Sequence, residues 1–347
     1  MRNFTLICII TFCLAGCFES DKVGTIESGG ADRIETSADM GTYLQDQKPP
    51  VLESVGLWEN EYGPGLRLTT AHYEIFTTLL EPLMLRRVPG FVESAYRGYN
   101  SQLPRPIETG SKFTIYLFAD RWQWEDFTKA FTGEQAELFC KIKAGAYYYN
   151  GACVAYDIGR KRTLFALGHE GWHQFNSRHF KFRLPSWLDE GVAMLFEAHG
   201  TEQEVFYFEP AENMYRLKTL KKTLITNKMM PLKELIAINP GEVLATDETE
   251  AVMAFYAQSY ALVRFLREAG YGKRLGIYHQ LLQGGLRGDW PLSEVSKRIA
   301  IDRNIPRTIL WNRIVGLLLF EQYIGDDFDQ IEKEYLAFCR QIVETQD

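Results

Sequence analysis

Two histidines and a glutamate stand close together in the segment TLFALGHEGWHQF, residues 163–175. On a helix, His169 and His173 lie four positions apart, so both imidazoles share one face and can bind one metal ion. Glu170 is rotated by about 100° from His169 and can sit beside a water molecule instead of binding the metal. Imidazole nitrogens suit zinc, and a neighbouring carboxylate suits a general base. The spacing therefore predicts metal-assisted hydrolysis.

A third ligand is offered by the downstream segment LPSWLDEGVAMLFE. Sixteen residues separate His173 from Glu190, which is enough for the chain to turn and run a second helix back beside the first. Apolar residues at helical spacing make this second helix amphipathic. Glu190 then presents its carboxylate from the opening turns of that helix. Two nitrogens and one oxygen, with a fourth position open for water, are typical of catalytic zinc sites.

HEGWH followed by PSWLDEGVA resembles the gluzincin zinc metallopeptidases, especially the peptidase MA-like families. The resemblance covers residues 140–280 and implies a zincin-like metallopeptidase domain. It implies that His169, His173 and Glu190 bind zinc and that Glu170 is the general base and proton shuttle. At the position four residues after Glu190, thermolysin-like enzymes carry an aspartate that holds a ligand histidine, and this chain has Met194. Asp189 or Glu197 could take over that role.

The same resemblance implies a tyrosine that donates a hydrogen bond to the oxyanion. In AFYAQSYALVRFLREAGYG, residues 254–272, Tyr256 matches this position, and Tyr260, one helical turn away, is the alternative. A further implied feature is an edge strand that pairs with extended substrate, for which the candidate is GAYYYN, residues 145–150. This segment carries no acid of the kind that holds a free amine in related aminopeptidases, which favours an endopeptidase.

The sequence patterns around these residues predict an α+β fold with a mixed sheet. Residues 51–200 form the α/β half, with a first hairpin turning at Gly63-Pro64-Gly65 and a strand at 112–120. A second hairpin at 144–157 turns at Asn150-Gly151, a strong type I′ signal. Helical patterns lie at 76–99, 121–131 and 161–176, and another helix starts near Ser186. Residues 201–347 form a mostly helical half, with patterns at 212–226, 249–269, 271–283, 291–299, 306–322 and 327–343.

The N-terminus predicts an exported protein. Residues 1–16 have one basic residue and a short apolar run, too short for a permanent span, and read as a signal peptide. The sequence LAGC resembles the lipobox of bacterial lipoproteins, which implies cleavage before Cys17 and acylation of that residue. An ordinary signal peptide with a chance cysteine is the alternative. Residues 17–50 are polar and read as a lipidated flexible tether, and the expected location is the cell envelope, with the outer membrane favoured.

The composition limits which classes of partner are expected. The formal net charge is −7 and there is no basic run, so nucleic acid is not expected as a partner. Beyond the anchor, Cys140 and Cys153 could pair in an exported protein, leaving Cys339 free; three single buried thiols are the alternative. The oligomeric state is left open.

These observations favour a zinc-dependent, membrane-anchored peptidase acting on a peptide or protein. Two other hypotheses use the same residues. One is a catalytically inactive, peptidase-like binding or assembly lipoprotein of the envelope. The other is a zinc hydrolase of a non-peptide bond in the cell envelope. The presence of Glu170 speaks against the inactive form, because a purely structural metal site does not need a base.

Overall fold

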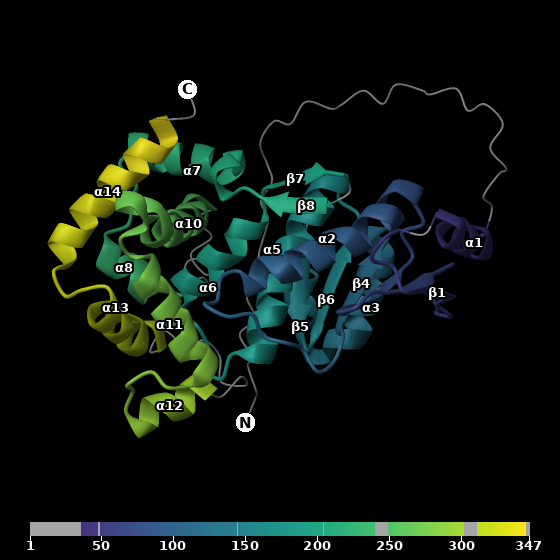
Figure 1. Cartoon of the computed structure of the whole chain (residues 1–347), viewed down its shortest axis with the longest axis horizontal. Coiled ribbons are helices and arrows are strands. Elements are labelled where there is room, and N and C mark those ends of the chain that lie inside the picture. The colour runs from purple at the N-terminus through teal and green to yellow at the C-terminus, as the bar shows by residue number, and fades with distance from the viewer. Residues whose placement is uncertain are drawn as a thin grey trace.

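The computed structural model describes residues 36–47, 49–143, 145–203, 205–239, 249–301 and 311–344. These residues form a sheet-containing half and a helical half, with helices α5 and α6 between them (Figure 1). The expected α+β fold, with a mixed sheet followed by a mostly helical C-terminal half, is confirmed. The expected signal peptide and the acylated Cys17 lie outside the described residues.

One sheet of six strands organises the first half. Its strands are β1 (Ser54–Leu57), β2 (Leu66–Thr69), β3 (Tyr73–Thr77), β4 (Phe113–Phe118), β5 (Ala146–Tyr149) and β6 (Ala152–Tyr156). Their order in space is β1-β2-β3-β4-β6-β5. The β3–β4 and β4–β6 pairs are parallel and the others are antiparallel. Strand β5 is therefore an edge strand, next to the longest helix of this half.

Both predicted hairpins are present. Strands β1 and β2 pair antiparallel around the Gly63-Pro64-Gly65 turn. In the second hairpin Tyr149 pairs with Ala152 across a two-residue turn, and Asn150 and Gly151 have φ values of 45° and 84°. Positive φ at both turn residues is the requirement of a type I′ turn, and asparagine followed by glycine tolerates it best.

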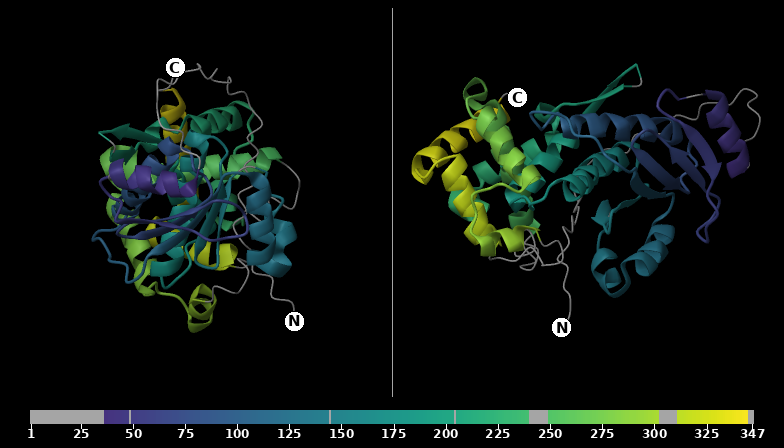
Figure 2. Two further views of the ribbon diagram at one scale, coloured as in Figure 1. Left: turned by 90° about the vertical axis from the view of Figure 1, so that its right-hand side faces the viewer. Right: turned by 60° about the horizontal axis from the view of Figure 1, so that its bottom comes forward.

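Side-chain alternation along β6 buries both faces of the sheet. Cys153 and Ala155 face the main core, while Ala152, Val154 and Tyr156 face a second, smaller core. Helices α2 (Pro82–Asn100) and α5 (Arg160–His179) pack on the first face. Helices α3 (Arg121–Thr132) and α4 (Ala136–Phe139) cover the second face (Figure 2). The motif helix α5 thus lies beside α2 and contacts both α2 and the sheet.

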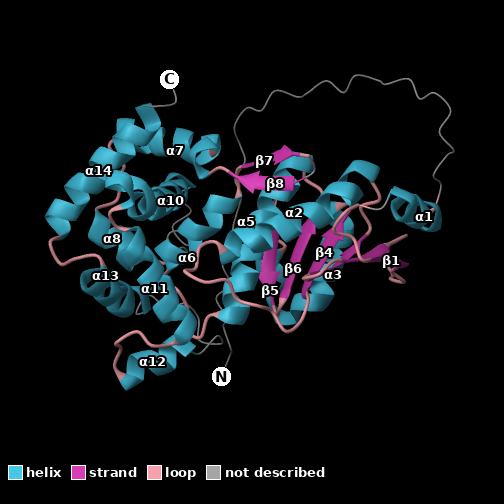
Figure 3. Cartoon of the chain, in the orientation of Figure 1, coloured by secondary structure: helices cyan, strands magenta, loops and turns pink. Residues whose placement is uncertain are grey.

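The helical half follows a short helix α6 (Ser186–Ala193) and a small hairpin of β7 (His199–Glu202) and β8 (Val205–Phe208). Figure 3 shows how helices dominate this half. They are α7 (Met214–Ile225), α8 (Leu232–Ala237), α10 (Thr249–Gly272), α11 (Leu275–Arg287), α12 (Glu294–Ile301), α13 (Leu317–Tyr323) and α14 (Phe328–Glu344). A π-helical segment, Trp311–Gly316, precedes α13. The helical patterns predicted here agree with the other helices to within a few residues, but α8 was not predicted. Residues 306–310 of one predicted pattern lie outside the described residues.

Three expectations need correction. Residues 37–47 are not a tether: they form helix α1 (Ser37–Gln47), which packs on β1, with Met40 and Leu44 in the core. The helix expected from residue 76 starts at Pro82, because Tyr73–Thr77 is taken into the sheet as β3. The β7–β8 hairpin was not anticipated.

The three described cysteines are free thiols, so Cys140 and Cys153 do not pair. Cys153 is buried on β6, and Cys140 is half-buried after α4. In the part of the chain that the structure covers, no helix combines the length and the apolar character needed to cross a membrane.

Candidate metal centre

Helix α5 carries both histidines on the side that faces α6. Leu164 and Leu167 bury its reverse side in the main core. The imidazoles of His169 and His173 lie one turn apart, with ring centroids separated by 5.0 Å. Both side chains are almost completely buried, at 0% and 5% exposure. The helix therefore presents two imidazoles to the protein interior.

Two glycines let α5 come close to its neighbours. A Cβ at Gly171, the first variable position of the HExxH motif, would collide with the hydroxyl of Tyr99 on α2. That hydroxyl donates a hydrogen bond of 2.7 Å to the carbonyl of Gly168. A Cβ at Gly168 would collide with the carbonyl oxygen of Phe196. The motif helix is thus fixed at two points beside the histidines.

Helix α6 brings Glu190 to the histidines. Pro185 precedes its first turn, and the N–H of Ser186 donates to Asn312 Oδ1 over 3.0 Å, which satisfies one of the open N–H groups at the helix start. Gly191 lies against α10, where an added Cβ would be 2.5 Å from the carbonyl oxygen of Ser259. The position of Glu190 is therefore set from the helical half of the molecule.

The three predicted ligands meet at one point. The Nε2 atoms of His169 and His173 are 3.2 Å apart, and Glu190 Oε2 lies 3.3 Å and 3.5 Å from them respectively. An ion with tetrahedral ligands at about 2.0–2.1 Å needs neighbouring ligand atoms about 3.3–3.4 Å apart. Neither Glu190 oxygen accepts a conventional hydrogen bond within the described ranges. This buried group could hold a metal ion, and its donor set and spacing fit zinc.

A carboxylate from outside the motif orients His169. Glu197, just after α6, lies 2.9 Å from His169 Nδ1. It also receives two hydrogen bonds from the Arg216 guanidinium, of 2.6 Å and 2.9 Å, and one of 2.7 Å from Asn213. Burial raises the pKa of the Glu197 carboxyl, but the Arg216 charge outweighs it and leaves that pKa below its usual value. Glu197 is therefore held as a carboxylate beside the ligand.

A second carboxylate orients His173. Asp189 Oδ1 lies 3.2 Å from His173 Nδ1 and accepts hydrogen bonds from Trp172 Nε1 at 3.0 Å and Asn176 Nδ2 at 2.8 Å. Nδ1 donation to a carboxylate fixes the imidazole tautomer and leaves the Nε2 lone pair for a metal. The two alternatives predicted for this role are both used, one for each histidine.

The charges in this cluster depend on one another. Burial raises the pKa of Glu190, but the His173 and His169 imidazoles outweigh it and hold that pKa well below its usual value. Burial lowers the pKa of His173, and the charges of Asp189 and Glu190 reverse the effect and raise it well above 6.5. In the absence of an ion the surroundings thus favour the Glu190 carboxylate beside a protonated His173, and an ion must displace the proton on the imidazole Nε2 in order to bind.

Glu170 lies beside the ligands and points to the edge strand. It is 1% exposed and hydrogen-bonds to the backbone of Tyr148 on β5. Its Oε2 has no hydrogen-bond partner among the described residues. Burial raises the pKa of Glu170 from 4.5 to about 7, against the opposing effect of the two histidines. A carboxyl with a pKa near neutrality and an open oxygen is suited to proton transfer.

The two candidate tyrosines have different surroundings. Tyr260 donates its hydroxyl hydrogen to the Pro210 carbonyl and accepts a hydrogen bond of 2.9 Å from Arg264, so its hydroxyl is committed away from the ligands. Tyr256 is 4% exposed, and its ring lies 5.5 Å from the guanidinium carbon of Arg216. The structure therefore brings Tyr256, not Tyr260, next to the group that supports His169.

Arg216 and Asn213 are two further residues of the site that were not predicted from the sequence. Both lie at the start of α7, in the helical half, and carry no local motif. The only indication would have been Glu197, because a glutamate that is buried requires a cationic partner. Two other histidines, His179 at the end of α5 and His199 at the start of β7, pack against aromatic rings, including Phe175 and Phe91.

Comparison with known proteins adds no assignment: no protein-family model matches the chain, and no curated protein matches it in sequence.

Proposed function

We propose that this protein is a zinc-dependent peptidase of the gluzincin type, with a zincin-like catalytic domain. The observation that carries the proposal is the set of three buried ligand atoms separated by 3.2–3.5 Å, with Glu170 directly beside them. A structural zinc site is normally closed by four protein ligands, whereas three ligands with an adjacent base are typical of hydrolysis.

His169, His173 and Glu190 would hold the zinc ion. A zinc ion bound there would lower the pKa of a water molecule towards about 7 and polarise the scissile carbonyl. Glu170 removes the proton of the attacking water with its open oxygen and passes that proton to the leaving amine. The hydrogen bond from the Tyr148 backbone orients the Glu170 carboxylate during both transfers.

Tyr256 is our choice for the group that donates a hydrogen bond to the oxyanion, since the Tyr260 hydroxyl is bound to Pro210 and Arg264. Losing one such donor typically raises the barrier by about 2.7–4 kcal/mol. The Arg216 guanidinium, stacked near the Tyr256 ring, restrains it from the side of Glu197.

The edge strand β5 supports a peptide as substrate. It pairs only with β6 in the six-stranded sheet, and the residue that bonds to Glu170 belongs to it. An extended peptide added along this edge would run past the ligands. The strand sequence AYYY contains no acid to hold a free amine, and this favours internal cleavage. We further propose attachment to the bacterial cell envelope through an acylated Cys17.

The test is Glu170→Gln, with Glu234→Gln on the exposed surface as the matched control. We expect Glu170→Gln to keep one zinc per chain and to lose hydrolysis, because amide nitrogen cannot take the proton. Zinc content is read by elemental analysis, and hydrolysis by mass spectrometry of a peptide library with and without chelator. Full activity of Glu170→Gln would exclude its role as base.

The same screen separates the alternatives. Chelator-sensitive cleavage of peptides supports a peptidase. Absence of peptide cleavage, together with chelator-sensitive release of products from envelope material, indicates a non-peptide bond. If the chain cleaves neither peptides nor envelope material, it would be a binding or assembly protein, whether or not it binds zinc.

A further inference from the structure

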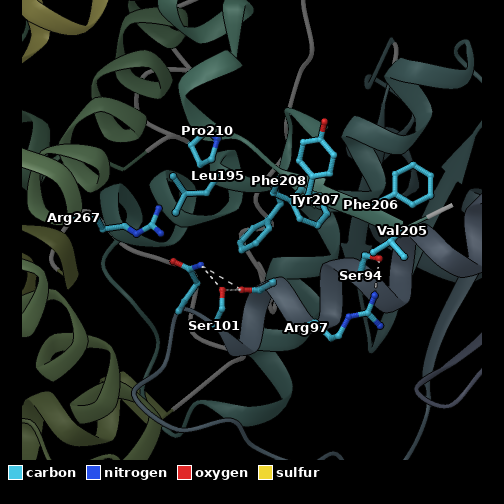
Figure 4. Close-up of a pocket in the computed structure, with 13 residues that line it drawn as sticks. Ser94, Arg97, Ser101, Leu195, Val205, Phe206, Tyr207, Phe208, Pro210 and Arg267 are labelled. Atoms are coloured by element: carbon cyan, nitrogen blue, oxygen red, sulfur yellow. Dashed lines mark hydrogen bonds between the residues drawn. The ribbon is translucent and has the colours of Figure 1, made fainter. Parts of the chain in front are cut away.

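The cavity shown in Figure 4 lies apart from the candidate metal centre. It has a volume of about 330 Å³ and lies between the last turns of α2, strand β8 and Arg267 of α10. None of the three candidate ligands lines it, nor does Glu170 or any residue of β5. The side chains of a peptide held at the metal ligands must therefore contact other residues. Strand β5, which bonds to Glu170, is the adjacent element.

The three tyrosines of β5 point to two faces of the sheet. Tyr147 and Tyr149 face the second, smaller core, where both contact the ring of Phe139 at centroid distances of 4.4 Å and 5.2 Å. Tyr148 pairs with Cys153, whose side chain lies in the main core. Directly paired residues of antiparallel strands share a face, so Tyr148 points to the face on which α5 lies.

Tyr148 is less packed than its neighbours. Its side chain is half-buried, whereas Tyr147 is completely buried and donates a hydrogen bond of 3.0 Å to Thr128 Oγ1. In the part of the chain that the structure describes, no aromatic ring lies against Tyr148 and its hydroxyl forms no hydrogen bond, unlike the rings and hydroxyl on either side of it. A half-exposed tyrosine ring of this kind is well suited to contact a ligand.

The backbone of Tyr148 faces the free edge of the sheet. Tyr149 and Ala152 flank the two-residue turn and form a hydrogen-bonded pair, so the next pair, Tyr148 and Cys153, is not hydrogen-bonded. The N–H and C=O of Tyr148 therefore point away from β6, in agreement with the hydrogen bond from its N–H to Glu170. The half-exposed ring and the contact with the proposed base thus belong to one residue.

We propose that Tyr148 is a specificity-determining residue, which selects substrates with an aromatic side chain beside the cleaved bond. Such selection rests on the proposed function and defines its substrate class. An extended peptide that pairs with β5 places the side chain opposite Tyr148 on the same face as the Tyr148 ring, and the side chains before and after it on the other face. Aromatic rings pack well edge to face or with an offset, so a phenylalanine at this position covers the exposed ring.

The experiment measures cleavage of a peptide library by mass spectrometry, with the unsubstituted chain, Tyr148→Ala and Tyr148→Phe. The unsubstituted chain should prefer phenylalanine over alanine roughly tenfold in kcat/KM at one of the two positions that flank the cleaved bond. Tyr148→Ala should abolish most of this preference, and Tyr148→Phe should keep it, because the ring is retained. The matched control Tyr271→Ala removes a fully exposed tyrosine of α10 and should leave the preference unchanged. A purely structural loss would lower both rates together and leave their ratio as it was.

A binding measurement separates the role of Tyr148 from hydrolysis. Fluorescein-labelled, capped Ala-Ala-Phe-Ala-Ala and Ala-Ala-Ala-Ala-Ala are titrated with the full chain carrying Glu170→Gln, with zinc added, and fluorescence anisotropy gives the affinity. The phenylalanine peptide should bind roughly tenfold more tightly, and adding Tyr148→Ala should remove the difference. Thermal melts check that each variant is folded.

The outcomes for Tyr148 and for the proposed function are distinct. If no peptide is cleaved but the difference in binding is found, the proposed function fails and the peptide subsite at Tyr148 stands. Equal binding of the two peptides, equal cleavage of phenylalanine and alanine peptides, or an unchanged preference in Tyr148→Ala would each overturn the role of Tyr148.

Discussion

At the scale of single residues, the candidate metal centre depends on carboxylates that do not touch the metal position. Glu197 and Asp189 each hold one imidazole by its Nδ1 atom. Glu197 in turn lies in a bidentate contact with Arg216. The ligand geometry is therefore supported by buried charges on three different segments.

Removal of the Glu197 charge should affect both metal affinity and folding. Glu197→Gln is expected to weaken zinc binding about 10–100-fold, the usual effect of losing a group that orients a ligand. It also removes the carboxylate that binds the buried Arg216 guanidinium, which costs about 3–5 kcal/mol of folding stability. Chelator competition measures the affinity, and urea unfolding measures the stability. The double variant Glu197→Gln/Arg216→Met should recover part of the stability; no recovery would contradict this account of Arg216.

His179 should make the stability depend on pH. Burial, and then the charge of Arg178, lower the pKa of His179 from 6.5 to about 4. As the pH falls below 6.5 the unfolded chain takes up this proton and the folded chain does not, so the stability present above pH 6.5 is lost towards pH 4. His179→Gln should flatten this part of the curve in urea unfolding at pH 7, 5.5 and 4. If His179→Gln leaves the dependence of unfolding free energy on pH unchanged, groups other than His179 control that dependence.

The cluster of candidate ligand residues could be predicted because its signal is local. His169, Glu170 and His173 share one helix, and Glu190 follows at a distance that a single turn of the chain can bridge. Asp189 and Glu197 were named as alternatives, but the choice between them required knowing which imidazole each one reaches. Arg216 was not predictable, since its contact depends on how α7 folds back over α6.

At the scale of elements, close approaches fix the position of α6 and therefore of Glu190. Gly191 touches the backbone of α10 at Ser259. This close approach is possible because glycine has no side chain. If a side chain is added at Gly191, α6 must move away from α10.

Gly191→Ala is expected to destabilise the protein by about 1–3 kcal/mol, because the new methyl group would be 2.5 Å from the Ser259 carbonyl oxygen. Movement of α6 should also weaken zinc binding. The matched control is Gly276→Ala in α11, where nothing lies within 4 Å of the new atom. There the higher helix propensity of alanine should stabilise by up to about 1 kcal/mol. Urea unfolding measures the stability of both variants. Similar stabilities of Gly191→Ala and Gly276→Ala would contradict the close contact at Gly191.

Elements with strong local signals were predicted well. The Asn150-Gly151 turn, the strand at 112–120 and most helices of the second half follow from turn chemistry and periodicity. Helix α1 was missed because its segment is polar and becomes ordered only through Met40 and Leu44 against β1 and α2. The β7–β8 hairpin was missed because its strands are only four residues long.

At the scale of the whole molecule, the candidate ligands lie on the two helices between the halves. His169 and His173 belong to α5, which packs on the sheet, and Glu190 belongs to α6, which packs on α10 of the helical half. A bound ion would therefore link the two halves through their central helices.

Zinc should stabilise the folded chain as a whole. An ion that binds only the folded state contributes about 4 kcal/mol when its concentration is 1,000 times its dissociation constant. We expect chelator to lower the melting temperature by several degrees and added zinc to restore it, as measured by circular dichroism. His173→Gln is the control, and its melting temperature should not respond to chelator. A wild-type melting temperature that is also unaffected would contradict a zinc site here.

The glycines packed against Tyr99, Phe196 and Ser259 have a practical consequence for tracing relatives of this chain. In a pattern search, the letters between the ligands of an HExxH motif are usually free. Here Gly168 and Gly171 flank His169 at points where no side chain fits, and Gly191 follows Glu190 for the same reason. A query of the form G-H-E-G-x-H with a later E-G would thus describe how α5 and α6 pack on their neighbours as well as which side chains are the candidate metal ligands, and it would select for this architecture more strictly than the ligands alone.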